Sequence, residues 1–541
     1  MNSEGFEALL ARASAPAQGA HAPAIDLSHH LSDVSRARET SPLKLFQKYF
    51  NKPGLIGLAG GLPAPAYFPF TDISSNILVH NSFPSSTSPE STFSWLWKLL
   101  GAKEKTTSIS VPKFATRPED INLATALQYG LSSGLPQLNK LVKDFSKKVY
   151  QPAYENWTTL LHAGNTDAWN KVVLTLCNPG EGVLVSRWTY PSAMATMKPY
   201  DIQPVTVDID AQGMRADALR EVLANWDEAA RGMPRPHVLY TVPIGENPTG
   251  TTTGLQRKKD IYQICVEFDV IIVCDDPYYV LQEGTYIPKA QREVRASETD
   301  EEFIASLEPS YLKIDYQGRV IRLDTFSKTM APGCRLGWYT CNEMFAERIE
   351  RAAETSTQAP CGFSQSLVAS TLIQWGEPGF MRWLKGLRVQ YTLRRDFLVD
   401  CFSEEFQLTS AAGSGLWTGC QVYNASPRTR PSSFFNEKMP VAKPLFSFVP
   451  PTSGMFVWLK VHLADHPDYE TVGVKELESK LFIELAEAGV VMGPGFMFNP
   501  TDDWSDVTSG HFRVSFSNGE KEDFKKATTI FGRVLREFMS A

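Results

Sequence analysis

The middle of the chain alternates short β-branched runs with longer helix-like segments, and this rhythm constrains the fold more than any other feature. The runs are Gly182–Ser186, Pro204–Asp208, Val238–Val242, Val270–Cys274 and Val320–Leu323. Such alternation predicts an α/β fold, in which helices flank a mainly parallel mixed sheet. Ligands of these sheets bind beyond the carboxyl ends of the strands, so polar residues directly after the runs are candidates for a site.

The length and the later part of the chain indicate two domains. At 541 residues with 43% hydrophobic side chains, the sequence can fill one or two large cores. Helical patterning over 365–402 and a mixed segment that ends in a helix at 521–538 indicate a smaller α+β domain. We expect a flexible N-terminal arm over 1–40, a large domain over 119–384, and a small domain built from 41–118 and 385–541. Surface insertions are expected at 80–118, 288–310 and 424–451, which are rich in Pro, Ser or charge.

Composition excludes several classes of function. The net charge is −7 with no dense basic block, so we expect no nucleic-acid binding. No apolar run approaches the roughly 20 residues that span a bilayer, so we expect no membrane insertion. The N-terminus lacks a secretory signal, so the eight cysteines are expected to be unpaired thiols in a cytoplasmic, reducing compartment. No C-x-x-C pair occurs, and His462 with His466 lacks a third ligand, so we expect no metal site.

The stretch Arg322–Trp338, RLDTFSKTMAPGCRLGW, places Lys328 between hydroxyl residues and a downstream arginine. A lysine bonded to an aldehyde cofactor as a Schiff base avoids the cost of being neutral at pH 7. Thr325, Ser327 and Arg335 are donors suited to a phosphate beside that lysine. The pattern therefore fits an anchor for pyridoxal phosphate, and the alternative is a surface lysine in a polar loop.

A carboxylate follows the run VIIVC, in the segment DDPYYVLQ. A buried Asp275 needs a positive partner, and a protonated pyridine nitrogen would serve. The alternative is a helix N-cap, which Asp276 before Pro277 could equally supply. We favour Asp275 as the functional carboxylate.

Further motifs supply donors of the right kind. Asn247 in VPIGENPTG and Tyr278 in DDPYYVLQ can both donate to the phenolic oxygen of the cofactor, although NPTG alone is also typical of an ordinary turn. In HAGNTDAW, a helix start would direct the backbone N–H groups of Asn165 and Thr166 at an anion, and it would be an N-cap as well.

Two further candidates also have a purely structural alternative. Tyr190, after the run GVLVS, can stack on a flat ring or be a core tyrosine. Arg513 lies in the alternating segment FRVSFS, where it can bind a substrate carboxylate bidentately or form an internal salt bridge.

Taken together, the motifs resemble the aspartate aminotransferase superfamily, the class I/II aminotransferases of fold type I that depend on pyridoxal phosphate. LAGGLPAPAYFPF at 58–70, ALQYG at 126–130, HAGNTDAW, ENPTG, DDPYYVLQ and DTFSKTMAPGCRLGW are similar to fungal aromatic amino acid aminotransferases and to kynurenine/2-aminoadipate aminotransferases. The similarity runs from about Ser41 to the C-terminus, apart from the insertions.

The resemblance assigns a role to each candidate residue. It implies that Lys328 is the Schiff-base lysine and Asp275 the pyridinium partner, with Tyr278 as a further catalytic residue. It implies cofactor contacts for Asn165, Thr166, Tyr190, Asn247, Thr325, Ser327, Arg335 and Tyr129, and substrate contacts for Arg513, Gly61 and Asn247. Tyr129 corresponds to a tyrosine that reaches the neighbouring subunit's phosphate, which implies a homodimer with shared active sites.

The activity implied by the resemblance is transfer of an amino group from an aromatic L-amino acid (Phe, Tyr or Trp) to a 2-oxo acid such as 2-oxoglutarate, with ping-pong kinetics. Donors such as 2-aminoadipate or kynurenine are the alternative. A lyase, synthase or decarboxylase with the same cofactor would use the same residues. A ligand-sensing regulator would need a DNA-binding domain, and residues 1–40 are too short and irregular to form one.

Overall fold

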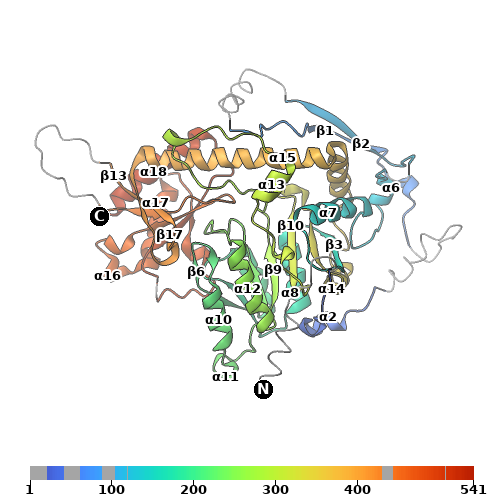
Figure 1. The fold of residues 1–541 in the computed structure, drawn as a ribbon, viewed down its shortest axis with the longest axis horizontal. Helices are drawn as coiled ribbons and strands as arrows, with labels where there is room; N and C mark the ends of the chain where they lie inside the picture. The colour runs from blue at the N-terminus through green and yellow to red at the C-terminus, as the bar shows by residue number, and fades with distance from the viewer. Residues whose placement is uncertain are drawn as a thin grey trace, which may run out of the picture.

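A computed structural model describes residues 21–41, 61–87, 104–117, 120–428, 443–505 and 507–540 (Figure 1). Residues 1–20 of the expected N-terminal arm lie outside this range, as do parts of the expected insertions at 80–118 and 424–451. Within the described residues, no helix is both long enough and apolar enough to cross a membrane.

A mixed sheet of seven strands forms the centre of the molecule, in the order β3-β11-β10-β9-β8-β4-β5. The strands are β3 (Trp157–His162), β4 (Gly182–Ser186), β5 (Gln203–Val207), β8 (Val238–Thr241), β9 (Ile271–Asp275), β10 (Val320–Thr325) and β11 (Gly337–Asn342). Neighbours from β10 to β5 are parallel, whereas β11 is antiparallel to both β10 and β3. The expected mainly parallel sheet is confirmed. Its central strands β4, β8 and β9 are buried on both faces, which explains why their sequences are continuous apolar, β-branched runs.

Helices cover this sheet, most of them in the connections between its strands. They include α7 (Pro136–Val149), α8 (Asn165–Leu176), α9 (Pro191–Met197), α10 (Ala216–Ala224), α12 (Leu255–Glu267), α13 (Asp300–Ser306) and α14 (Glu343–Glu354). In α7, the inward positions Leu138, Val142, Ser146 and Val149 recur at helical spacing and are buried. Helix α8 packs on α9 and α14. Helix α10 packs on α12 (Figure 1).

A second sheet of six antiparallel strands lies toward the C-terminus, in the order β12-β13-β14-β15-β17-β16. The strands are β12 (Phe406–Ala412), β13 (Gln421–Pro427), β14 (Phe446–Phe448), β15 (Phe456–Val461), β16 (Gly493–Pro494) and β17 (Gly510–Ser515). Helices α16 (Tyr469–Val472), α17 (Val474–Glu487) and α18 (Lys521–Phe538) accompany it, and α18 has the bounds expected from the sequence. This is the smaller α+β unit expected from the sequence.

Helix α15 (Gly362–Glu405) runs along the top of the molecule in Figure 1 and contacts α7, α18 and β12. Its backbone departs from helical geometry at Gly376, where φ is +66°, two residues before Pro378. Glycine permits that conformation without a steric penalty, and the proline cannot continue the helical hydrogen bonds. The expected boundary at 384/385 falls inside this helix, and the division into domains stays a prediction.

Two shorter pieces precede the central sheet in the chain. Strands β1 (Asp72–Leu78) and β2 (Thr106–Pro112) form an antiparallel pair that packs on α15, so part of the expected insertion at 80–118 is a strand paired with the segment before it. Before them, η1 (Ser28–His30) and α2 (Asp33–Ala37) dock on the large sheet's helices, and Leu27 is fully buried there. The segment 21–41 is therefore anchored rather than extended away from the fold.

Candidate active site

A cavity of about 410 Å³ opens where β8, β9 and β10 end and residues from the second sheet approach. Of the residues predicted from the sequence, it brings together Asn165, Thr166, Tyr190, Asn247, Asp275, Tyr278, Thr325, Ser327, Lys328, Arg335 and Arg513. They come from segments spread over 165–513 of the chain. Their convergence at the carboxyl ends of parallel strands is the position at which α/β sheets bind ligands.

Lys328 follows β10 and lies on the wall of this cavity, half-buried. Burial lowers the pKa of its amine, Asp275 opposes that shift, and the charges of Arg513 and Arg335 add to it. A lowered pKa makes the neutral, nucleophilic amine more accessible than in an ordinary surface lysine. The alternative of a lysine in a polar surface loop does not describe this environment.

Asp275 is the last residue of β9 and is buried, with 7% of its surface exposed. Its Oδ1 accepts from Asn165 Nδ2 at 2.6 Å and its Oδ2 accepts from the Tyr240 hydroxyl at 2.7 Å. Burial raises the pKa of Asp275, while these two donors and the Lys328 charge lower it. The carboxylate is held in place by neutral donors, so it can still pair with a cation that enters the cavity.

The neighbouring Asp276 has a different partner. Arg322 on β10 donates to it and to Asp324, and all three side chains are buried. Asp276 therefore belongs to an internal ion-pair network below the cavity. This separates the two adjacent carboxylates, of which Asp275 alone lines the cavity.

The N-terminus of α8 and Arg335 meet at one end of the cavity. Gly164 caps the helix with φ +100°, and a Cβ built on it would lie 2.2 Å from Arg335 Nη2. Only a residue without a side chain lets the guanidinium lie against this backbone. The positive guanidinium and the free N–H groups of the helix start together favour an anion at this end.

Hydroxyl groups complete that end. Thr325 Oγ1 lies 2.9 Å from Ser327 Oγ, and Arg335 Nη1 donates to Ser327 Oγ at 3.5 Å. The side chain of Asn165 is directed away from this end, because its amide donates to Asp275 and to the Leu323 carbonyl oxygen. Only its backbone N–H remains for an anion.

On the opposite side, Arg513 of β17 donates from Nη1 to Asn247 Oδ1 at 2.6 Å. Since the Asn247 oxygen accepts this bond, its Nδ2 group is left to donate elsewhere. The guanidinium also lies over the rings of Phe456 and Phe498, at 4.4 and 4.8 Å from their centroids. Within the described residues, no carboxylate forms a salt bridge with Arg513, which leaves its charge available to a ligand carboxylate.

Two tyrosines bracket the cavity. Tyr190 is the N-cap residue of α9 and is half-buried, so its ring is part of the cavity wall rather than of the core. Tyr278 is 5% exposed and packs edge-on against Phe456, with ring centroids 5.8 Å apart. Burial raises the pKa of the Tyr278 hydroxyl, so it stays protonated and acts as a hydrogen-bond donor.

Two predicted residues lie elsewhere. Gly61 is exposed, and a Cβ at that position would have no heavy atom within 4 Å. Tyr129 is 64% exposed on the surface just after α6 (Leu123–Ala126). Neither lines the cavity of a single chain, so their roles stay predictions.

Sequence reasoning missed Tyr240, Trp169 and Phe456, which also line the cavity. Tyr240 is on β8 within a run that reads as an ordinary buried strand, so only its position one strand from Asp275 reveals its role. Trp169 belongs to the helix of the motif HAGNTDAW, and a closer look at helical spacing from Asn165 would have placed it on the same face.

Comparisons with known proteins agree with this geometry. Residues 102–425 match the sequence profile of the family described as aminotransferase class I and II. An aromatic amino acid aminotransferase of Schizosaccharomyces pombe is 35% identical over 94% of this chain and 98% of its own length. An L-tyrosine:2-oxoglutarate aminotransferase of Serpula lacrymans is 33% identical over 95% of this chain and 96% of its own.

Among solved structures, aminotransferase Aro8 from Candida albicans is similar with a TM-score of 0.80. The two share 33% sequence identity, and the similarity covers 96% of this chain and all of that one. Both sheets and the cavity between them therefore fall within the matched region.

Proposed function

The chain belongs to the class I and II aminotransferases, enzymes that depend on pyridoxal phosphate, and on that premise we propose that its amino donor is an aromatic L-amino acid and its acceptor is 2-oxoglutarate. The observation that carries the proposal is the convergence of Lys328, Asp275 and Arg513 in one cavity. The donor and acceptor classes are supported by the names of relatives that match over nearly the whole chain.

The residues present fit the cofactor at both of its charged ends. Arg335, the open space over Gly164 and the start of α8 suit a phosphate. Asp275 is a buried carboxylate held by neutral donors, which suits a protonated ring nitrogen. Asn165 Oδ1 is also buried without a partner among the described residues, as expected beside a polar group not yet in place.

We assign the holding roles accordingly. Arg335, Ser327, Thr325 and the backbone N–H groups of Asn165 and Thr166 would hold the phosphate. Asp275 would pair with the ring nitrogen, Tyr190 would stack on the ring, and Asn247 with Tyr278 would donate to the phenolic oxygen. Lys328 would bind the aldehyde carbon through its amine. When bound, pyridoxal phosphate accepts the electrons released as a bond at the amino acid α-carbon breaks.

The chain's own groups then position the substrate and move the proton. Arg513 would grip the substrate α-carboxylate with its planar fork, which fixes the α-carbon relative to Lys328. The Lys328 amine, released when the donor's amino group takes its place, would carry a proton away from the α-carbon as general base. The same amine would return a proton in the second half-reaction, when the 2-oxo acid acceptor occupies the site of the departed product.

Aromatic side chains around Arg513 support an aromatic donor. Phe456 and Phe498 flank the guanidinium, and Tyr190, Tyr278 and Trp169 add further ring surface to the cavity wall. Rings pack favourably on rings, beyond the area that they bury. A donor held at Arg513 by its carboxylate would have its side chain among these rings.

We also propose a homodimer in the cytoplasm. Tyr129, exposed on the surface of one chain, would reach the phosphate end of the partner's cavity. All eight cysteines are unpaired, which supports a reducing compartment. Light scattering during size exclusion would test the dimer, and a monomer that is fully active would contradict shared sites.

The test of function is formation of glutamate from 2-oxoglutarate, with Phe, Tyr, Trp, kynurenine, 2-aminoadipate and Leu as donors. Wild type, Lys328→Ala and the control Lys140→Ala, an exposed lysine paired with Asp144, are compared. Turnover led by the aromatic donors and abolished only in Lys328→Ala supports the proposal. A lead for 2-aminoadipate or kynurenine would overturn the donor class, and release of ammonia or carbon dioxide without an acceptor would overturn the proposed transfer.

A further inference from the structure

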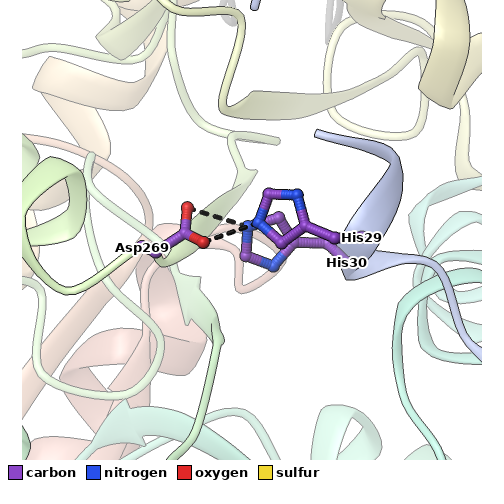
Figure 2. Close-up of side chains that lie close together, drawn as sticks. All are labelled: His29, His30 and Asp269. Atoms are coloured by element: carbon purple, nitrogen blue, oxygen red, sulfur yellow. Dashed lines mark hydrogen bonds and ion pairs between the residues drawn. The ribbon is translucent and has the colours of Figure 1, made fainter. Parts of the chain in front are cut away.

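Two adjacent histidines and an aspartate cluster far from the cavity. His29 and His30 lie in η1, and Asp269 lies in the turn between α12 and β9. Figure 2 shows both imidazole rings directed at the Asp269 carboxylate. The cluster borders a surface cavity of about 360 Å³. Nothing in the proposed catalytic reaction uses these residues.

The three side chains have the spacing of metal ligands. His29 Nε2 lies 2.6 Å from Asp269 Oδ2, and His30 Nε2 lies 3.1 Å from Oδ1. One potential ligand atom from each residue lies within 4.8 Å of the other two. Ligands of a tetrahedral Zn²⁺ at about 2.0–2.1 Å are separated by roughly 3.3 Å, which falls inside this range. Small side-chain rotations suffice, since His29 is 56% exposed.

A hydrogen-bond relay sets which nitrogen of His30 faces the carboxylate. The Glu181 carboxylate can only accept, so His237 donates to it from Nε2, at 3.3 Å. In the tautomer that carries its proton on Nε2, His237 accepts at Nδ1, and His30 can donate to it from its own Nδ1, 3.0 Å away. A neutral His30 is left with a bare Nε2 that points at Asp269 Oδ1.

That arrangement places a nitrogen lone pair against a carboxylate oxygen, and a cation between them satisfies both. The relay has the form found around metal-bound histidines, whose second nitrogen is held by a carboxylate or another acceptor. Asp269 is itself fixed, because Arg319 Nη1 donates to Oδ1 at 2.8 Å. Its Oδ2 remains directed at His29.

Charges of both signs surround the cluster. Arg36, Arg235 and Arg319 face it with positive charge, and Glu181 and Glu228 with negative charge. Arg36 is directed to the His29 carbonyl oxygen, and Arg235 lies over the Phe268 ring. Each of the three arginines is thus directed at a carbonyl oxygen, a ring or the Asp269 carboxylate, and a cation would meet Asp269 and the two imidazoles.

We propose that His29, His30 and Asp269 form a site for a divalent transition-metal ion such as Zn²⁺. Imidazole nitrogens favour zinc and its neighbours over Mg²⁺ or Ca²⁺, which prefer oxygen ligands. His237 and Glu181 act as positioning residues that orient His30. The fourth ligand is water, since His29 and Asp269 both face solvent.

The place of the site in the fold gives the ion a structural role. Asp269, His237 and Arg319 each precede a parallel strand, whereas the catalytic cavity lies beyond the strands' carboxyl ends. Strand β9 alone separates the two edges by about 17 Å. A metal here would tie the N-terminal segment 21–41 to the central sheet and leave the chemistry alone.

Zinc binding is measured on the full-length holoenzyme, in whatever oligomeric state it has in solution. Any histidine tag is first cleaved off, and bound metal is removed with a chelator. All proteins carry Cys361→Ser, because that exposed thiol could bind zinc by itself. Titration calorimetry with ZnCl₂ and metal analysis after dialysis should give one equivalent per chain in the parent. A rise in Tm with zinc is expected, because the ion binds the folded state.

Three variants separate the site from other zinc binding. His29→Gln removes an exposed ligand, and Asp269→Asn removes the carboxylate while keeping a residue that tolerates the φ of +56°. The third variant, Glu181→Gln, changes a residue that only positions His30, and its zinc affinity should fall by about 10- to 100-fold. The zinc affinity of His29→Gln and of Asp269→Asn should fall by more than that. The control His21→Gln, an exposed histidine of the same segment, should bind like the parent.

Equal zinc affinity in the parent, His29→Gln and Asp269→Asn would overturn the site, as would less than one equivalent in the parent at micromolar zinc. Either result would leave the cluster as a hydrogen-bonded anchor, with a proton in place of the ion. Transaminase activity is not the readout, so failure of the catalytic proposal would leave this test unaffected.

Discussion

The Tyr240 hydroxyl donates to Asp275 Oδ2 at 2.7 Å, from a neighbouring strand of the same sheet. Together with Asn165 it occupies both oxygens of the carboxylate. Burial raises the pKa of Asp275, and these two donors work against that shift. Tyr240 thus helps to keep ionised the group that we propose as the partner of the cofactor's ring nitrogen.

Tyr240→Phe removes that donor with almost no change in volume. A hydrogen bond to a charged group contributes about 1.5–3 kcal/mol, so we expect cofactor affinity or kcat to fall by roughly 10- to 100-fold. The measurements are the Kd for pyridoxal phosphate and kcat with a saturating donor. Tyr262→Phe is the matched control, since its buried hydroxyl donates to Asp315 at 2.9 Å away from the cavity. Equal losses in both variants would show that the effect is one of stability alone.

Gly164→Ala should weaken cofactor binding by displacing Arg335. The added Cβ would lie 2.2 Å from Arg335 Nη2, and the exposed guanidinium can only move away from the helix start. Gly180→Ala is the control that separates displacement of Arg335 from backbone strain. Gly180 also has a positive φ, +84°, but a Cβ built on it would have no heavy atom within 4 Å. Both variants should lose about 1–3 kcal/mol of stability from the positive φ that the new side chain must adopt. Only Gly164→Ala should raise the Kd for pyridoxal phosphate, and a similar rise in Gly180→Ala would contradict the anion site.

Much of the fold was accessible from the sequence because its signals are local. The run Gly182–Ser186 and the helix at 521–538 have the expected bounds, since each is a continuous pattern with clear ends. The expected strands at 204–208 and 270–274 are each displaced by one residue, because apolar character does not mark where ladder hydrogen bonds begin.

The site was accessible where a motif carries its own chemistry, as with Lys328 and Asp275. It was not accessible where the role depends on a contact distant in sequence. Tyr240 and Asp275 are 35 residues apart, and His29 and Asp269 are 240 apart. The absence of metal was expected from cysteine spacing and the pair His462 and His466, and neither pattern bears on adjacent histidines that meet a distant aspartate.

Arg513→Lys should impair recognition of the substrate carboxylate while the cofactor stays bound. Lysine keeps the charge but lacks the planar fork, and the hydrogen bond from Arg513 Nη1 to Asn247 Oδ1 is lost. Disrupting a buried, hydrogen-bonded charge pair costs about 2–5 kcal/mol, so kcat/KM for phenylalanine should fall by about 30-fold or more. Arg533→Lys, an exposed arginine paired with Glu537, is the control.

The discriminating measurement for Arg513 compares phenylalanine with phenethylamine, which lacks the carboxylate, in single-turnover reactions. The preference for phenylalanine should shrink in Arg513→Lys, and the Kd for pyridoxal phosphate should match wild type. An unchanged preference would assign the carboxylate to another group and leave Arg513 as an internal support for Asn247.

Glu283 supplies a pH-dependent term in stability. It is fully buried, neither carboxylate oxygen has a hydrogen-bond partner among the described residues, and burial raises its pKa to about 8. An unfolded glutamate titrates near 4.3, so between these values the folded chain binds the extra proton. Stability from this group is therefore complete below about pH 4 and is lost as pH rises through 8, at about 1.4 kcal/mol per pH unit.

Glu283→Gln keeps the shape of the protonated acid and cannot ionise. Its Tm should stay close to that of wild type near pH 4 and exceed it increasingly toward pH 8, because only wild type must bind a proton, or bury a charge, when it folds. Scanning calorimetry across that range measures the difference, with Glu537→Gln, an exposed carboxylate, as the control that should follow wild type. Parallel Tm curves for wild type and Glu283→Gln would contradict this prediction. They would mean that the positive charge of Arg395, which lowers the pKa of Glu283, already stabilises the ionised carboxylate in the folded chain.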